Sequence, residues 1–412
     1  MSVPFLRKCG REISFNRDKH WTNAKNFDVS DMILMTARIK SVPWSFPCTK
    51  FDLGTSVLQR MDEPAVVDFF DACAPFMTSL TIRDDWNDAI FCNNISSGLR
   101  FLQLKTLVLQ LTQSTEYANS FFRLVEIIIA AAPTLTHVNF INRTGPEEYL
   151  ASFISLLKNN VRNITSLRIQ SETLDSHLVE LASVGFRLKY FYFDFSGSRL
   201  ETEPLFKFFE SQTDSLQRLV IGDEAMCSLC TVLFPLMNEL RSITIVGSTL
   251  GQISLTFPHI DYQKNFPKLE RLWFRDCYGE FVEFIHDNMR PSYSLQILKL
   301  TDFADSNLIF KAAALFPRLK KLEVPCMTSV IYATYDSFPN LEELVINTRF
   351  VSVIDDLISG IPARQCREIM DKELYLQGRD VISRFQVLPY SILSLKSELF
   401  ELFNVQYTET KI

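Results

Sequence analysis

The chain has 412 residues, of which 47% are hydrophobic and 22% charged, a composition typical of a folded protein rather than a disordered one. Its formal net charge of −6 works against the phosphate attraction on which nucleic-acid binding depends, so we expect no nucleic-acid partner. No apolar run is long enough to cross a membrane or to form the core of a secretory signal, which predicts a cytoplasmic or nuclear protein that is not secreted.

A six-residue phrase with apolar residues at its first, fourth and sixth positions recurs along the chain. Alternate residues of a strand share one face, so each phrase predicts a short strand that buries its fourth and sixth residues. Clear copies begin at residues 77, 104, 135, 164, 188, 216, 240, 269, 295, 319 and 341, and a weaker copy occupies 48–53. The spacing averages about 26 residues, which lies within the range of leucine-rich repeats.

Between the phrases, apolar residues recur at intervals of three and four, which predicts helices. We expect helices at 63–74, 116–132, 147–160, 174–184, 203–212, 279–289 and 307–316. Prolines such as Pro133, Pro267 and Pro317 stand just before the next phrase, where they stop a helix and favour extended backbone. The sequence therefore predicts an α/β fold: a right-handed, horseshoe-shaped repeat solenoid with a parallel inner sheet and outer helices.

The amino-acid pattern of several repeats resembles that of F-box/leucine-rich repeat proteins over roughly residues 48–350. The matching stretches are FPKLERL (266–272), FPRLKKL (316–322), FPNLEEL (338–344) and ESQTDSLQRL (210–219). The Asn or Cys that such repeats carry three residues after the last strand leucine is present only as Cys277. We find no F-box motif in the chain, and residues 3–21 resemble the stretch that follows one.

This resemblance implies a substrate-recognition subunit of an SCF-type ubiquitin ligase, with a Skp1-type adaptor as a further partner if an F-box exists upstream. The alternative is a stand-alone repeat scaffold or inhibitor with no ligase link. We expect residues 1–47 to form an N-terminal cap or a post-F-box segment, 48–350 the solenoid, and 351–412 a mostly helical C-terminal cap. A partner-binding arm is the other interpretation of the two ends.

The sequence contains no motif typical of catalysis or cofactor binding. Cys227 and Cys230 form the only CxxC pair and would share one helix face. Without a second pair or a nearby histidine, they indicate buried helix packing more than a metal or redox site. We therefore predict a protein that is not an enzyme, with no catalytic residues, no metal and no cofactor.

The third and fifth positions of each phrase, and the residue that follows the phrase (its seventh position), should point to the concave face of the solenoid. In the central and later repeats these positions hold aromatic and cationic residues, the types that are enriched at binding hot spots. The predicted binding residues are Tyr190, Tyr192, Arg218, Arg271, Trp273, Arg275, Lys299 and Lys321. They favour an acidic or phosphorylated protein target. The alternative for Trp273 is a surface aromatic covered by neighbouring side-chain stems.

Overall fold

A computed structural model describes much of the chain between residues 36 and 397. The chain divides into two compact units, Met1–Gln212 and Thr213–Ile412, and we describe each by itself. The described residues are 36–37, 40–41, 50–53, 64–84, 98–111, 118–142, 147–160, 163–171, 177–194, 202–231, 234–247, 255–256, 260–275, 277, 282–285, 289–300, 306–325, 334, 337–338, 340–348, 368–369 and 392–397.

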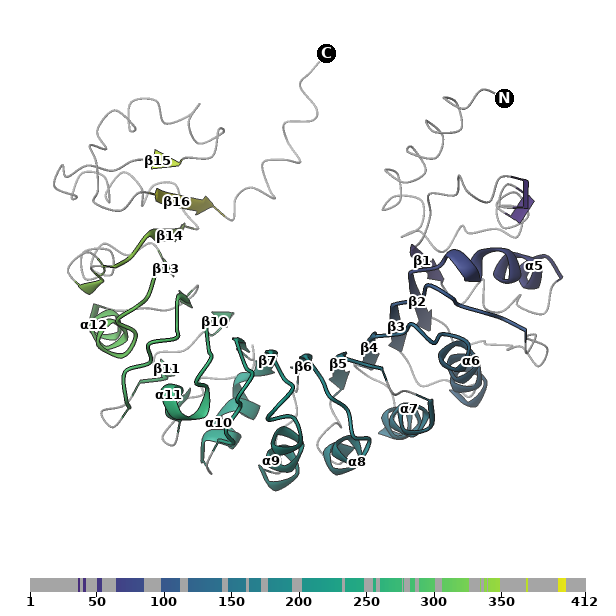
Figure 1. The fold of residues 1–412 in the computed structure, drawn as a ribbon, viewed down its shortest axis with the longest axis horizontal. Coiled ribbons are helices and arrows are strands. Elements are labelled where there is room, and N and C mark those ends of the chain that lie inside the picture. The colour runs from purple at the N-terminus through teal and green to yellow at the C-terminus, as the bar shows by residue number, and fades with distance from the viewer. Residues whose placement is uncertain are drawn as a thin grey trace, which may run out of the picture. The chain divides into compact units, whose positions relative to one another are not determined.

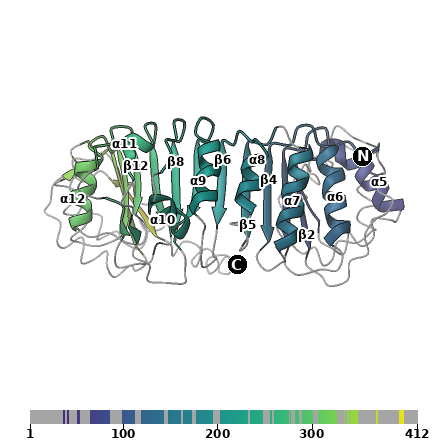
Figure 2. The same cartoon turned by 90° about the horizontal axis from the view of Figure 1, so that it is seen from below.

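The first unit alternates strands and helices (Figure 1). Its strands are β1 (Lys50–Leu53), β2 (Ser79–Asp84), β3 (Thr106–Leu111), β4 (His137–Asn142), β5 (Ser166–Ser171) and β6 (Tyr190–Asp194). Each strand pairs in parallel with the next along the chain. The helices are α5 (Pro64–Cys73), followed by the short 3-10 helix η3 (Ala74–Phe76), then α6 (Ala118–Ala130), α7 (Glu147–Asn160), α8 (Leu178–Ser183) and α9 (Thr202–Ser211). Figure 2 shows α6 and α7 in front of the strands and running along them.

The second unit repeats the parallel sheet with more varied connections. Its strands lie in the order β7 (Arg218–Gly222), β8 (Ser242–Val246), β10 (Arg271–Arg275), β12 (Ile297–Leu300), β13 (Lys321–Pro325), β14 (Glu343–Thr348), β16 (Ile392–Ser397) and β15 (Glu368–Ile369). The helices are α10 (Asp223–Thr231), α11 (Tyr262–Asn265) and α12 (Ser306–Leu315). A separate parallel pair joins β9 (Leu255–Thr256) to β11 (Val282–Glu283).

Every predicted phrase forms a strand, and the α/β leucine-rich repeat fold is confirmed within each unit. The strand begins at the third residue of the phrase, and equivalent residues face each other: Leu107 pairs with Val138, and Leu272 with Leu298. These fourth-position residues are fully buried, as are most of the sixth-position ones. Burying each such side chain contributes about 1.5–3 kcal/mol, so the recurring apolar positions are the main source of the fold's stability.

A repeated backbone contact sets this register. At the second position of the phrase, one carbonyl accepts the amides of two successive residues in the next repeat. The Lys105 carbonyl accepts from Thr136 and His137, and the same arrangement recurs at Thr136, Thr165, Gln217, Arg241, Glu270, Gln296 and Lys320. Because the contact involves only backbone atoms, it does not depend on which side chains the two repeats carry.

Buried amide side chains stabilise the turns that precede the strands by hydrogen bonds to backbone groups. Gln212 is almost fully buried; its Nε2 donates to the Phe186 carbonyl at 3.1 Å, and its Oε1 accepts from the Leu188 amide at 3.0 Å. Asn265 does the same in the second unit, donating to the Phe234 carbonyl at 2.6 Å. These contacts satisfy backbone groups that would otherwise be buried without a partner.

Two segments differ from the sequence prediction. The helix expected at 279–289 is wrong where the structure describes it, because Val282 and Glu283 form β11 and Phe284 stacks on Phe274 with ring centroids 4.6 Å apart. Apolar residues at 281, 284 and 285 mimic a helical period, but strand pairing with β9 determines the backbone. Within 351–412, predicted mostly helical, the described residues form β15 and β16, and the remainder lies outside the described residues. The domain boundaries at 47/48 and 350/351 also lie outside them and stay predictions.

Candidate functional site

The residues that alternate with the buried strand positions lie on the sheet face opposite the helices, which we call the front face. In the second unit, strand pairing arranges them in rows that cross the sheet. One row contains Arg218, Ser242, Arg271, Ile297, Lys321 and Glu343, and the next contains Val220, Thr244, Trp273, Lys299, Glu323 and Val345. Six of the eight predicted binding residues therefore share one face of one unit.

Trp273 lies near the centre of this face and is half-buried. The Arg275 Cζ lies 5.9 Å from the centre of its ring, and the Lys299 Nζ lies 4.9 Å from it. Both distances are within the range of cation–π attraction. The indole Nε1 is buried and has no hydrogen-bond partner among the described residues. Trp273 is thus held between two cations, with its ring partly accessible.

Two of the predicted cations are neutralised by glutamates on the next strand. Lys299 forms an ion pair with Glu323 at 2.9 Å, and Lys321 forms one with Glu343. Glu323 is buried, with only 4% of its surface exposed. The strand phrases predicted both lysines as binding cations, because each phrase was interpreted without the outward residues of its neighbour. The register alone would have placed each lysine opposite its glutamate.

Arg218 and Arg271 are in a different environment. Both side chains are exposed, and neither forms an ion pair within the part of the second unit that the structure describes. Ser242 lies between them in the row, since it pairs with Arg218 on one side and Arg271 on the other. The front face of this unit therefore has a positively charged half over β7–β10 and an ion-paired half over β12–β14.

The two predicted tyrosines belong to the first unit. Tyr192 is mostly buried because the Arg168 guanidinium lies over its ring, with the Cζ 4.2 Å from the ring centre. Arg168 also donates from Nη2 to Gln170 Oε1 at 3.0 Å. Tyr190 is half-buried and pairs with Ser166 across the sheet. The tyrosines thus form a local cluster with Arg168, which the sequence analysis did not select, and we treat them separately from the arginines of the second unit.

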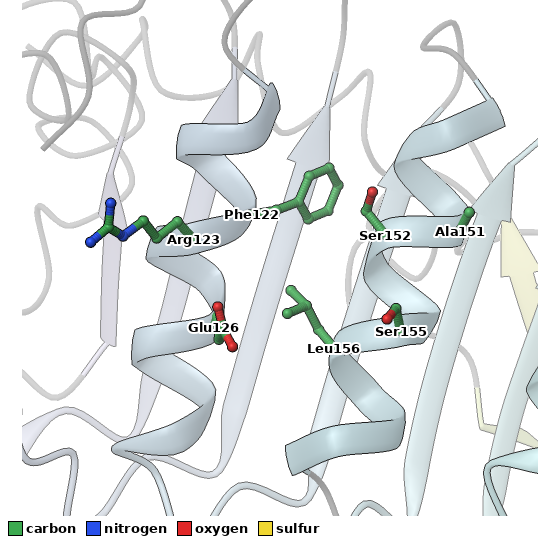
Figure 3. Close-up of a pocket in the computed structure, with 7 residues that line it drawn as sticks. All are labelled: Phe122, Arg123, Glu126, Ala151, Ser152, Ser155 and Leu156. Atoms are coloured by element: carbon green, nitrogen blue, oxygen red, sulfur yellow. The ribbon is translucent and has the colours of Figure 1, made fainter. Parts of the chain in front are cut away.

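A groove on the helix side separates α6 from α7 (Figure 3). Phe122 is directed across it toward Ser152, whereas Arg123 points away. The other lining residues are Glu126, Ala151, Ser155 and Leu156. Phe122 is nearly buried and packs edge-on against Tyr149, with ring centroids 5.8 Å apart. The lining thus combines one carboxylate, one guanidinium and two hydroxyls with apolar side chains.

The CxxC pair lies on α10, where Cys230 is buried, Cys227 is half-buried, and neither cysteine forms a disulfide bond. Cys230 is fully buried, and this burial, with a smaller contribution from Cys227, raises the pKa of its thiol far above the usual range. A protonated thiol is neither a good nucleophile nor a good metal ligand. The described residues contain no group of three His, Cys, Asp or Glu side chains placed to hold a metal ion. The absence of a metal or cofactor in the protein itself stays a prediction.

Comparisons with known proteins add little to this description. No family model matches the chain, and no curated protein does. Among solved structures, the leucine-rich repeat protein LegL7 from Legionella pneumophila aligns with a TM-score of 0.40 and 13% identity, over 80% of this chain and 95% of that one. A chain from the yeast Rad7–Elc1 complex aligns with a TM-score of 0.39 and 14% identity, over 84% and 93%. Within the described part of the chain, no helix is long and apolar enough to cross a membrane.

Proposed function

We propose that this chain is a non-catalytic protein-interaction module and that the front face of its second unit is the contact surface. The observation that carries the proposal is Trp273, a large aromatic residue in the middle of a sheet face, bordered by Arg275 and Lys299. Tryptophan and arginine are the residues most enriched at interaction hot spots. The strands beneath them are fixed by a packed core, so the surface is pre-organised for a partner.

The proposal also concerns the kind of protein complex in which this chain acts. The repeat phrases resemble those of F-box/leucine-rich repeat proteins, which supports a substrate-recognition subunit of an SCF-type ubiquitin ligase acting in the cytoplasm or nucleus. The second candidate is a stand-alone scaffold or inhibitor that uses the same face. Pull-down of a Skp1-type adaptor by this chain, or by a form extended upstream if the gene encodes an F-box there, would favour the ligase role. Failure of both forms to capture it would favour the scaffold.

The test of the binding face is proximity labelling with the intact chain, followed by affinity measurement with the recovered partner. Trp273→Ala should weaken binding by about 2 kcal/mol, because a central aromatic anchor is lost. The matched control is Tyr293→Ala, which removes another aromatic side chain, 54% exposed in the turn before β12 and outside the front face. The proposed face would be contradicted if both substitutions weakened binding equally, or if neither substitution weakened it.

A further inference from the structure

We propose that the positively charged half of this face, over β7, β8 and β10, binds an acidic segment of the partner through glutamate or aspartate carboxylates held by Arg218 and Arg271. The inference rests on the proposed function and adds the chemistry of the ligand and its position. Lys299 and Lys321 lie on the same face, but we do not propose them as the main contacts for the acidic segment.

The positions of the two arginines support separate carboxylate contacts. Arg218 and Arg271 lie two strand spacings apart in one row, which corresponds to roughly 10 Å. Ser242, which lies between them, and Thr244 in the next row are small and half-buried. The two exposed arginine side chains therefore lie on either side of a shallow surface formed by small residues. This spacing suits two carboxylates along one segment better than a single phosphate, which would require both side chains to converge.

The charges of the described residues support an anion at this place. Arginine remains charged at every physiological pH and offers forked donors that match a carboxylate. Lys299 and Lys321 already have carboxylate partners in Glu323 and Glu343, so an incoming anion would have to displace them. Arg218 and Arg271 have no such partner among the described residues of their unit, and binding there requires no exchange.

Trp273 adds an apolar boundary to the same surface. It pairs with Thr244 across β8 and β10, and Arg271 and Arg275 precede and follow it on the front face of β10. An acidic segment lying across Ser242 and Thr244 would place its carboxylates at the arginines and an apolar side chain against the indole of Trp273. This combination distinguishes a polypeptide from a free anion, because only a polypeptide supplies both contacts.

The experiment measures binding of labelled short peptides to the intact chain by fluorescence anisotropy. The probe peptide alternates glutamate with alanine and contains one central leucine; three versions replace glutamate by glutamine, lysine or phosphoserine. We expect the glutamate peptide to bind, the glutamine and lysine peptides to fail, and the affinity for the glutamate peptide to fall as salt is raised. Preferential binding of the phosphoserine peptide, with the glutamate peptide inactive, would overturn the carboxylate assignment.

Charge reversal locates the site. Arg218→Glu and Arg271→Glu should each weaken binding of the glutamate peptide on the order of tenfold. The matched control is Lys311→Glu, the same change of charge at an exposed position of α12 on the helix side of the same unit. Circular dichroism confirms that each variant is folded.

The outcomes separate this inference from the broader proposal. If the glutamate peptide binds equally well to both arginine variants and to Lys311→Glu, the inference is wrong. If a recovered protein partner depends on Trp273 while no acidic peptide binds, the interaction face stands and the ligand assignment falls. If the peptide depends on both arginines but the partner is insensitive to Trp273→Ala, the acidic site stands and the broader function is wrong.

Discussion

The two units use the same strand phrase and present different surfaces. In the first unit, half of the front positions of β3 and β4 carry hydroxyls or amides and the others are Val108, His137 and Ile141. The one described cation–π contact of this unit joins Arg168 to Tyr192. In the second unit the same positions hold arginines and ion pairs around Trp273. The buried first, fourth and sixth positions stay apolar in both. The comparison shows that the positions that build the sheet and the positions on its front face vary independently.

The helix sides of the units differ as well. The first unit uses full helices, such as α7 with 14 residues, whereas the second connects β8 to β10 through β9 and the four-residue α11. Phe140 of β4 stacks on Phe153 of α7, with ring centroids 4.4 Å apart. In the second unit, Tyr262 of α11 and the following Phe266 supply the aromatic packing instead. A regular sheet thus accepts irregular connections as long as they bring large apolar side chains.

The largest expected effects come from core substitutions, which test whether the cores of the two units contribute equally to stability. Phe191→Ala in β6 should lower the free energy of unfolding by about 3–5 kcal/mol, and Leu298→Ala in β12 by about 2–5 kcal/mol, because each leaves a cavity beneath the sheet. Both residues are fully buried. Urea denaturation measures the loss, and hydrogen exchange should place the lost protection in the unit that carries the change. Unchanged midpoints would contradict the assignment of these residues to the core.

An intermediate effect is expected from the ion pair that the second unit has next to Trp273. Lys299→Met should destabilise the protein by about 2 kcal/mol, since it removes the lysine that is ion-paired with the nearly buried Glu323. Lys320→Met is the control, because its partner Glu342 is 64% exposed and water can replace the lysine. Equal thermal midpoints for the two variants would show that burial of the glutamate is unimportant.

The smallest effect concerns an ion pair between the residues that immediately precede β8 and β10. Arg241 donates to Glu270 at 3.0 Å between neighbouring repeats, and both side chains are more than a third exposed. Arg241→Ala should cost less than about 1 kcal/mol, and the difference should vanish at high salt. Denaturation at two salt concentrations measures it. A larger, salt-independent loss would mean that this pair contributes to the register between repeats.

The strands were predictable from the sequence because their apolar positions are repeated and mutually consistent. The phrase beginning at Leu295, for example, specifies both the burial of Leu298 and the orientation of Lys299. Helices with long apolar stripes, such as α6 and α12, were predictable for the same reason. The helix expected at 279–289 failed because a local apolar spacing was compatible with two backbones, and pairing with Leu255–Thr256 favoured the strand.

The candidate site was predictable residue by residue but not as a set. Outward positions could be read from the phrase, so Trp273 and its flanking arginines were selected. The neutralisation of Lys299 by Glu323 depends on two repeats lying in exact register, which no single phrase expresses. Gln212 and Asn265 were missed because a buried amide has no periodic signal; its role is defined by the carbonyl that it contacts.

The backbone contact at the second position of each phrase has a consequence for altering this protein. Because a carbonyl and two amides set the alignment of neighbouring strands, any non-proline residue at the front positions leaves that alignment intact. A single insertion inside a strand, in contrast, would turn the following side chains to the opposite face. Insertions between the sixth position and the next helix do not reach the contact. Outside the coupled pairs Lys299–Glu323 and Lys321–Glu343, residues of the front face can therefore be replaced one at a time, while changes of length are accommodated in the connections.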